Sequence, residues 1–447
     1  MSKPQRAIDL HPTMSKKFKR LPGFRDFPPE DLTVRAHVFE AWRRVSRRYG
    51  FLEYDGPPLE PLDLYVEKSG EEIVAQLYSF RDKGDREVAL RPEMTPSLAR
   101  MLAERSRSLP KPIRWFSVPQ LFRYERHQRG RLREHFQWNV DVVGEKGVSA
   151  DAEVLAVGID GLRELGLTDQ DVRARVSDRR LLSALLGAAG VEEERRPAAF
   201  SVIDKLEREG PHKSRQRLSA ETGVSSAAAG DILELLSGDL DAVAAHFPER
   251  DEVVEEVTRL REYMDTLDAM GLGSFVELDL SIVRGLAYYT GIVFELFDRK
   301  GELRAICGGG RYDRLLELVG GEAQPAVGFG MGDVVLTDLL GERGLLPDTA
   351  RSLDFYVVAV GEELRPRVLS LAHALRERGR SVSYSLKPQA VGKQFKSAGT
   401  EGAREVIVLG PAEVARGVAV VRDMVSGKER EVSLEELGDD GWRMRES

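Results

Sequence analysis

The alternation of polar and apolar residues is clearest in residues 115–144. In the second half of this stretch, Gln137, Asn139 and Asp141 share one parity, and the opposite parity is apolar: Phe136, Trp138, Val140 and Val142. Successive side chains of a strand point to opposite faces, so the polar residues line one face of a predicted strand. A rougher alternation precedes the basic stretch 126–134, and together they predict a long antiparallel hairpin with a cationic loop. A half-buried sheet with one hydrated face fits the same alternation equally well.

Helical periodicity dominates much of the chain outside this hairpin. Apolar residues recur at about 3.6-residue spacing in residues 30–49 and 149–165, which predicts two amphipathic helices. Residues 178–271 carry helical patterns with little strand signal, which indicates a helical subdomain inserted into the surrounding unit. Alternating stretches predict a hairpin at 78–91 and a strand at 274–281.

The C-terminal part has a different pattern of polar and apolar residues. After a linker at 345–351, strands alternate with helices, which favours a small α/β domain with a mainly parallel sheet. Strands are predicted at 354–360, 382–386, 406–409 and 417–423, and helices at 363–378 and 390–399.

Composition narrows the class of protein. The 447 residues include 42% hydrophobic and 31% charged residues, an ordinary balance for a soluble globular protein. No apolar run approaches the ~20 residues that span a bilayer, and the basic start lacks the apolar stretch of a secretory signal. One cysteine, Cys307, excludes an intramolecular disulfide framework and a multi-cysteine metal site, and it suits the reducing cytoplasm. The net charge of -8 excludes bulk attraction to nucleic acid, so RNA contacts require local basic patches.

Several stretches resemble the motifs of one enzyme family. The hairpin sequence FRYERHQRGRLREHFQ, at 122–137, is similar to motif 2 of class II aminoacyl-tRNA synthetases. Three further stretches are similar to loops and signatures of histidyl-tRNA synthetases: RPEMT at 91–95, RGLAYYTGIVFE at 284–295 and CGGGRYDRL at 307–315. The resemblance extends over nearly the whole chain, from about residue 18 to 432.

The resemblance implies a fold and an activity. It implies an α/β protein with a class II catalytic domain at 18–345, built on an antiparallel sheet, and a helical insertion at 178–271. It further implies an anticodon-binding α/β domain at 352–447. The implied reaction activates L-histidine with ATP, accompanied by Mg²⁺, to histidyl-adenylate and transfers histidine to the 3' end of tRNA(His). A motif 1-like segment after the first helix implies a homodimer.

The resemblance also implies roles for individual residues. Arg123 and Arg284 are expected at the α-phosphate of ATP, where cations stabilise two approaching anions. Expected to bind histidine are Glu93, Thr95, Gln137, Asp141, Tyr288, Tyr289 and Tyr312. Expected to bind ATP beside the two arginines are Glu125, Phe136 and Arg311. Expected to contact tRNA are Arg126, Arg129, Arg131, Arg133, Lys393 and Lys396. No side chain is expected to ligate a resident metal.

Two expectations concern what these side chains do. A carboxylate and neutral acceptors suit an ammonium group, so Glu93, Thr95 and Gln137 are expected around the histidine amino group. Asp141 is expected to accept a hydrogen bond from the imidazole. From local sequence alone, Thr95 also suits the N-cap of a helix whose first turn contains Pro96.

Three positions depart from the family pattern. Val335 occupies the place of the motif 3 arginine, which packs on adenine and meets the γ-phosphate; Arg311 and Arg91 are candidates to replace it. Asp141 stands where many members have Glu, and Ala287 where many have Asp. Two alternatives therefore stay open: a histidine-binding regulatory subunit of ATP phosphoribosyltransferase, and a tRNA-sensing module that charges no tRNA. Histidine-dependent pyrophosphate exchange would separate both from a synthetase.

Overall fold

The computed structural model describes residues 18–66, 75–125, 130–284, 288–350 and 352–438. The chain divides into two compact units, Met1–Pro347 and Asp348–Ser447. In the described ranges, no helix is both long enough and apolar enough to cross a membrane.

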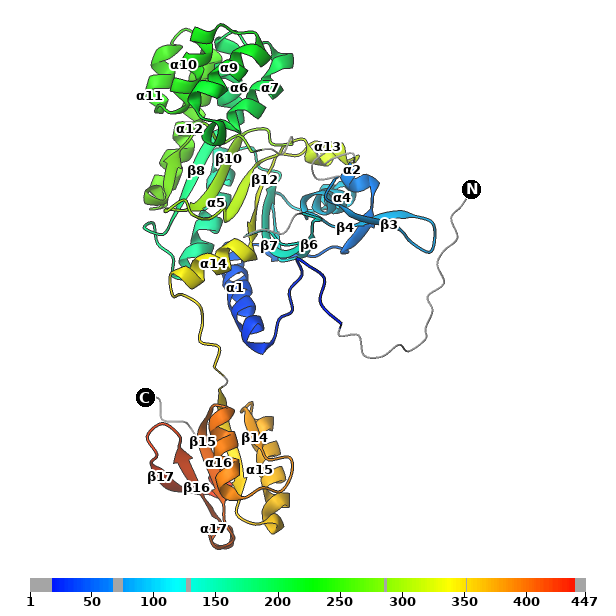
Figure 1. Ribbon diagram of the computed structural model, residues 1–447, viewed down its shortest axis with the longest axis vertical. Helices are drawn as coiled ribbons and strands as arrows, with labels where there is room; N and C mark the ends of the chain where they lie inside the picture. Colours follow the sequence, from blue (N-terminus) through cyan, green and yellow to red (C-terminus); the bar gives the residue numbers. More distant parts are fainter. Residues whose placement is uncertain (1–17, 67–74, 126–129, 285–287, 351, 439–447) are drawn as a thin grey trace. The chain divides into compact units, whose positions relative to one another are not determined.

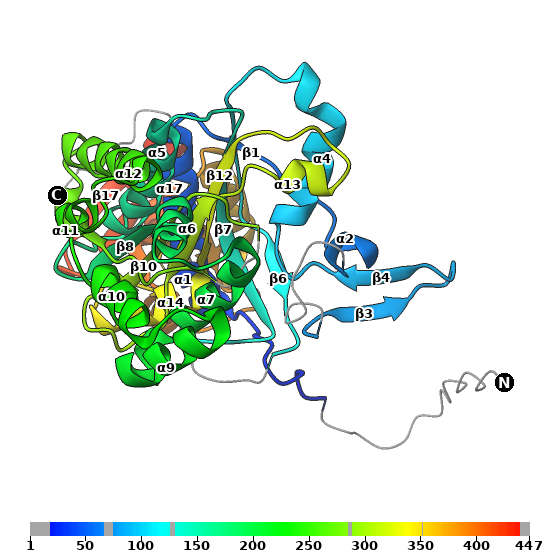
Figure 2. The same ribbon diagram turned by 90° about the horizontal axis from the view of Figure 1, so that it is seen from above.

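The first unit is built on one mixed sheet (Figures 1 and 2). Among the described residues it has nine strands, in the order β1-β5-β7-β12-β11-β10-β8-β9, with β6 paired to β7. Only the outer strands β1 and β9 pair in parallel with their neighbours, so the centre is antiparallel, as expected. The strands are β1 (Leu52–Glu53), β5 (Ile113–Ser117), β6 (Gln120–Phe122), β7 (Glu134–Val143), β8 (Val172–Asp178), β9 (Val276–Leu278), β10 (Ile292–Asp298), β11 (Cys307–Arg311) and β12 (Ala326–Gly332).

The apolar face of β7 packs on two helices, α1 (Pro29–Arg48) and α5 (Val148–Arg163). The rings of Trp42 and Trp138 stack with centroids 5.8 Å apart, and Trp138 Nε1 donates to Ser46 Oγ at 3.0 Å. A Cβ at Gly161 would lie 2.3 Å from the Trp138 ring, so glycine permits this close packing. The predicted alternation is therefore confirmed, and it leaves the polar face of β7 on the other side of the sheet.

The predicted hairpin at 78–91 is confirmed as β3 (Tyr78–Arg81) and β4 (Glu87–Leu90), which pair with β2 (Leu59–Pro61). It leads into α4 (Thr95–Arg105), whose N-cap is Met94 without a side-chain capping bond. The expected N-cap role of Thr95 is wrong, because Thr95 is the first helical residue. Its hydroxyl is therefore not used as a cap.

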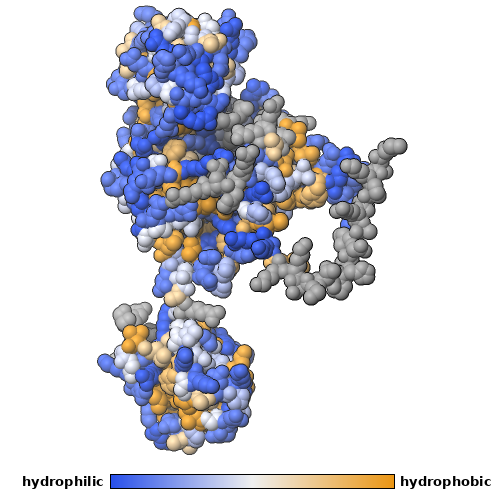
Figure 3. All heavy atoms as spheres, viewed as in Figure 1, coloured by the Kyte–Doolittle hydropathy of each residue, from blue (hydrophilic) through white to orange (hydrophobic). Residues whose placement is uncertain are grey.

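After β8 ends at Asp178, the regular structure up to residue 271 consists of helices joined by turns, as predicted. Its helices are α6 (Arg179–Ala188), α7 (Arg196–Ile203), α8 (Leu206–Glu209), α9 (Pro211–Thr222), α10 (Ser226–Leu236), α11 (Leu240–His246) and α12 (Asp251–Ala269). Buried Asp178 caps α6 by accepting from the Arg180 amide at 2.7 Å, and it pairs with Arg259 of α12. Hydrophilic side chains dominate the visible surface of these helices (Figure 3). The strand predicted at 274–281 is shorter, since only Val276–Leu278 pairs, after a 3-10 turn.

The end of the first unit carries two further helices, α13 (Leu315–Leu318) and α14 (Asp333–Glu342). Helix α14 starts directly after β12, the strand–helix junction expected of a motif 3-like segment. Val335 lies in its first turn and is buried.

The second unit is an α/β domain with five strands among its described residues, in the order β14-β13-β15-β16-β17. Strands β14, β13 and β15 are parallel, whereas β16 and β17 are antiparallel, so the sheet is mixed rather than mainly parallel. Its elements are β13 (Leu353–Ala359), α15 (Arg365–Glu377), β14 (Val382–Tyr384), α16 (Val391–Thr400), β15 (Ala403–Leu409), α17 (Pro411–Ala415), β16 (Val418–Asp423), β17 (Glu429–Ser433) and α18 (Leu434–Gly438).

Candidate active site

A cavity of about 220 Å³, the polar cavity, opens on the polar face of β7. Its lining comes from the start of α4 and the loop before it, from the segment after β6, from β7, from the segment before β10, from β11 and the residue after it, and from the middle of β12. All seven residues predicted to bind histidine lie in this lining, together with Arg123 and Arg284: Glu93, Thr95, Gln137, Asp141, Tyr288, Tyr289 and Tyr312. Segments that are far apart in the sequence are thus brought to one site.

Three glycines make room for these side chains. A Cβ at Gly308 would lie 1.4 Å from Arg284 Nη1, and one at Gly328 would lie 2.2 Å from Asp141 Oδ1. A Cβ at Gly330 would lie 2.6 Å from Gln137 Cδ. Larger residues on β11 and β12 would displace the polar groups, so glycine is required by close approach here.

Asp141 is buried deep in the polar cavity and accepts a hydrogen bond from the Tyr312 hydroxyl. Burial raises the pKa of the Asp141 carboxyl to about 7, although the Tyr312 hydrogen bond acts in the opposite direction. A carboxyl poised near neutrality, with an aromatic hydroxyl beside it, suits a ring with N–H and N groups such as imidazole.

Glu93 and Thr95 also line the polar cavity. The Tyr288 hydroxyl donates to Glu93 Oε2 at 3.4 Å and also lies beside the Thr95 hydroxyl, which the helix does not use as a cap. Glu93 has only 5% of its surface exposed. A buried carboxylate with neutral oxygens around it is an arrangement that binds a primary ammonium group.

A second cavity of about 530 Å³, the arginine cavity, shares Arg123, Gln137, Arg284 and two glycines with the first. Four arginines line it, whereas only two carboxylates do: Arg123, Arg131, Arg284, Arg304, Glu125 and Glu295. His135 also lines it, and burial, reinforced by Arg123 and Arg25, lowers the pKa of its imidazole to about 3, so the ring is neutral. This excess of positive charge in a recess suits a polyanion.

The two shared arginines are held in place differently. Arg123 Nε donates to the Pro92 carbonyl at 2.9 Å, and Arg284 Nη1 pairs with Glu295 Oε1 at 2.9 Å. Arg284 has a φ of 55°, a left-handed conformation that costs a non-glycine residue about 1 kcal/mol or more. Within the described residues, its Nε is buried without a hydrogen-bond partner. Strain and an unsatisfied donor at the junction of two cavities are features of a binding site.

The expectation that Phe136 binds ATP is contradicted by the structure. Its ring lies on the apolar face of β7, 5.2 Å from the Phe39 ring and 4.8 Å from the Arg35 guanidinium. His135, one residue earlier, points to the opposite face and lines the arginine cavity. Sequence parity could have found it, because His135 shares the parity of Gln137 and Asp141.

The expectation that Arg311 binds ATP is also contradicted by the structure. Its buried guanidinium binds Asp151 through Nε at 3.0 Å and through Nη2, and it donates to the Glu145 carbonyl at 3.0 Å. Arg91, the other candidate for the missing motif 3 cation, donates to Asp55 and to backbone carbonyls. Neither arginine lines the arginine cavity, because the guanidinium groups of both bind carboxylates and backbone carbonyls elsewhere.

The expected tRNA-binding arginines divide into three groups. Arg131 lines the arginine cavity and pairs with Glu125 at 3.0 Å. Arg133 stacks over Tyr124, with 4.2 Å from its guanidinium carbon to the ring centre. Arg126 and Arg129 lie outside the described residues, and so does Ala287, one of the three departures from the family pattern.

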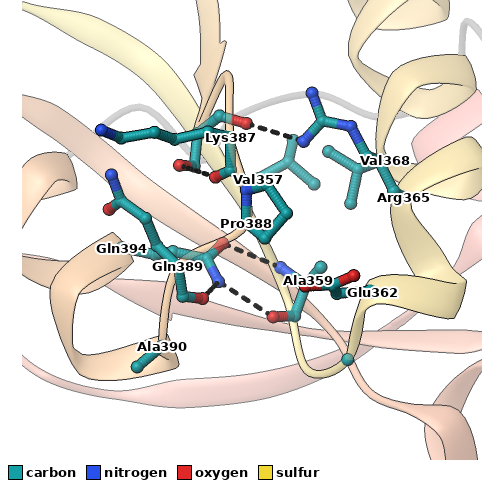
Figure 4. A pocket seen from close by; sticks show the side chains of 12 residues that line it. Val357, Ala359, Glu362, Arg365, Val368, Lys387, Pro388, Gln389, Ala390 and Gln394 are labelled. Atoms are coloured by element: carbon teal, nitrogen blue, oxygen red, sulfur yellow. Dashed lines mark hydrogen bonds between the residues drawn. The ribbon is translucent and has the colours of Figure 1, made fainter.

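The second unit has its own cavity, of about 360 Å³, at the C-terminal ends of β13 and β14 (Figure 4). Strand β13 has β14 on one side and β15 on the other, so the order in which strands are added to the sheet changes side at β13, and such points commonly bind ligands. The Gln394 amide joins the backbones of Ala359 and Gln389 and builds the wall. Lys387 and Arg365 line the cavity, whereas Lys393 and Lys396 lie exposed on α16 outside it.

Comparison with known proteins agrees with this geometry. The family model described as histidyl-tRNA synthetase matches residues 23–333, and the model described as anticodon binding domain matches 354–439. The chain belongs to the histidyl-tRNA synthetase family.

Relatives in this family match the chain over almost its full length. A histidine–tRNA ligase of Opitutus terrae is 45% identical, covering 94% of this chain and 97% of the relative. A chloroplastic/mitochondrial histidine–tRNA ligase of Arabidopsis thaliana is 41% identical, covering 93% of this chain and 85% of the relative. The crystal structure of a histidyl-tRNA synthetase from a Nostoc species superposes with a TM-score of 0.80 at 26% identity, covering 95% of this chain and 98% of that one. The predicted family and fold class are thereby confirmed.

Proposed function

We propose that this protein is a histidine–tRNA ligase, which activates L-histidine with ATP and transfers it to the 3' end of tRNA(His). The observation that carries the proposal is the meeting of two cavities at Arg123 and Arg284. One cavity offers groups for an ammonium and an imidazole, and the other offers positive charge for a polyphosphate.

In the first step, Glu93, Thr95 and Gln137 hold the ammonium group of histidine, and Asp141 orients the imidazole. The histidine carboxylate then lies toward the junction, where ATP presents its α-phosphate. A carboxylate oxygen forms a bond to the α-phosphorus, the bond to the β-phosphate oxygen breaks, and diphosphate leaves. Arg123 and Arg284 stabilise this step because they neutralise the two approaching anions and the charge on the leaving group.

Mg²⁺ would enter with ATP, as part of the substrate. Within the described residues, no group of three or more His, Cys, Asp or Glu side chains could hold a metal ion. Glu125 and Glu295 are the carboxylates of the arginine cavity, so they are the side chains that would help to hold such an ion. Bound to the outer phosphates, it would withdraw charge from them.

In the second step, a hydroxyl of the terminal ribose of tRNA attacks the histidyl carbonyl, and AMP leaves. We propose that Arg131 and Arg133, with Arg126 and Arg129, contact the acceptor end, and that Lys393 and Lys396 contact the anticodon arm. Contacts of this kind bind phosphates, so the affinity for tRNA should fall as salt rises.

We further propose a homodimer in a reducing compartment such as the cytoplasm. The segment resembling motif 1 includes β1, an edge strand of the large sheet on which Leu52 has 67% of its surface exposed. β1 has only two residues and offers little backbone for pairing, so the support comes from the exposed apolar side chain of Leu52. Light scattering after size exclusion tests this, and a monomer at micromolar concentration would contradict it.

One observation favours a different function. Val335 removes the motif 3 arginine, which suits a protein that binds histidine and regulates another enzyme. The match of 354–439 to the anticodon-binding model counts against this alternative, because such a regulator has no need of tRNA.

Charging of tRNA with tritiated histidine tests the proposed function. Arg284→Ala should lower the charging rate by roughly 100-fold or more, as removal of one preorganised charge typically does. Arg314→Ala, which removes an arginine whose side chain is 74% exposed, is the matched control and should charge normally. Absence of charging by the wild-type protein, or normal charging by Arg284→Ala, would contradict the proposal.

A further inference from the structure

The outer end of the arginine cavity is formed by two segments that are distant in the sequence. A Cβ built on Gly130 would lie 3.3 Å from Val335 Cγ2 and 3.7 Å from Arg304 Cδ. Val335 comes from the first turn of α14, and Arg304 comes from the turn between β10 and β11. Both side chains line the same cavity, so Arg304 reaches the space beside the residue that stands in place of the motif 3 arginine.

The position along the cavity indicates which part of a nucleotide would lie there. Arg123 and Arg284 line both cavities, so the α-phosphate belongs at their junction if histidine occupies the polar cavity. Arg304 does not line the polar cavity, and it lies with Arg131 near Gly130. A phosphate chain that extends away from the junction toward this end would place its outer phosphates between cations.

We propose that Arg304 binds the outer phosphates of ATP and so replaces the arginine that Val335 lacks. This inference rests on the proposed function, since it takes ATP as the ligand of the arginine cavity. It also accounts for the departure at Val335, because the cation comes from the turn between β10 and β11 rather than from α14. Arg311 and Arg91 are engaged by Asp151 and Asp55 and are not needed for this role.

The charges around Arg304 favour a phosphate. Desolvation lowers the pKa of its guanidinium, and so does Arg131, while Glu125 acts in the opposite direction. The two arginines therefore repel each other across the cavity, and a phosphate between them would relieve that repulsion. Arg304 is exposed, so its flexible side chain can adjust to the ligand.

Calorimetric titration of the full chain with ATP and, separately, with AMP tests the proposal. Arg304→Met keeps most of the aliphatic stem and removes the charge. Because AMP lacks the outer phosphates, this variant should weaken ATP binding roughly 10- to 100-fold and leave AMP binding within about twofold. Lys300→Met removes a charge from the same turn outside the cavity lining, so it should leave both affinities unchanged.

A second variant separates loss of a contact from misfolding. Val335→Arg in the Arg304→Met background places a cation on α14 again. The double variant should therefore bind ATP at least about tenfold more tightly than Arg304→Met does. Unchanged ATP affinity in Arg304→Met, or an equal loss for AMP, would overturn the proposal.

The same proteins distinguish this inference from the proposed function. Wild type could lack histidine-dependent pyrophosphate exchange while Arg304→Met selectively loses affinity for ATP. That result would support the contact between Arg304 and the phosphates and contradict the proposed ligase function. If wild type shows histidine-dependent exchange and Arg304→Met keeps full affinity for ATP, the ligase function is supported and the Arg304 contact is contradicted. A wild-type protein that binds no ATP overturns both.

Discussion

Asp141, which is proposed to bind the imidazole of histidine, is expected to destabilise the ligand-free protein. Its carboxyl pKa is raised from 3.8 to about 7, chiefly by burial. At about 1.4 kcal/mol per unit, keeping this carboxylate ionised in the folded state costs on the order of 4 kcal/mol. The folded state binds the proton more tightly than the unfolded state does, so stability falls as pH rises and levels off above the folded pKa.

Asp141→Asn should therefore stabilise the ligand-free protein at alkaline pH. The amide keeps the shape of the side chain and an acceptor for the Tyr312 hydroxyl, but it carries no charge. Between about pH 5.5 and about pH 8.5, wild type loses about 2 kcal/mol that the variant retains. With roughly 2 °C per kcal/mol, the Tm advantage of the variant should be about 4 °C larger at the higher pH.

Thermal unfolding at the two pH values measures this difference, and Asp151→Asn provides the contrast. Asp151 is equally buried, but it pairs with Arg311, so its loss leaves a buried guanidinium without its main partner. That variant should lose about 3–5 kcal/mol at both pH values. In a separate calorimetric titration, Asp141→Asn should bind histidine roughly 10- to 100-fold more weakly than wild type. A Tm that falls in Asp141→Asn at alkaline pH would refute the reasoning.

Two further substitutions test the walls of the cavities. Glu93→Gln removes the charge expected at the histidine ammonium, so in pyrophosphate exchange the KM for histidine should rise roughly 10- to 100-fold while the KM for ATP stays unchanged; equal KM values for histidine would contradict this role. His135→Ala should raise the KM for ATP about tenfold, whereas His135→Phe keeps a ring and should stay within about threefold of wild type, because a neutral ring contributes by stacking. Equal KM values for ATP in the two variants would show that the ring does not contact the nucleotide.

The parity of β7 and the signature stretches predicted the polar cavity well. Gln137 and Asp141 lie on one face because a strand has a period of two, and this held over the whole length of β7. The same rule contradicted the assignment of Phe136, whose ring packs beneath the sheet against Phe39. For Phe136, the alternation of residues along β7 therefore predicted the orientation of the side chain correctly, whereas the resemblance to motif 2 did not.

Other features depend on three-dimensional neighbours that no local pattern reveals. Arg311 was a candidate for ATP as a cation that could replace the motif 3 arginine, but its guanidinium binds buried Asp151 on α5. Arg304 carried no sequence signal, since an arginine near a turn is usually a solvated surface residue. Thr95 suited an N-cap by residue type, but the helix starts at Thr95 itself. For Arg311 a contact across the fold decided the role.

ATP–pyrophosphate exchange with each amino acid offered separately tests the central claim most directly. Exchange that depends on histidine alone would show that the two cavities meeting at Arg123 and Arg284 activate this amino acid, despite Val335 in place of arginine. Absence of exchange with histidine, or equal exchange with several amino acids, would contradict the account.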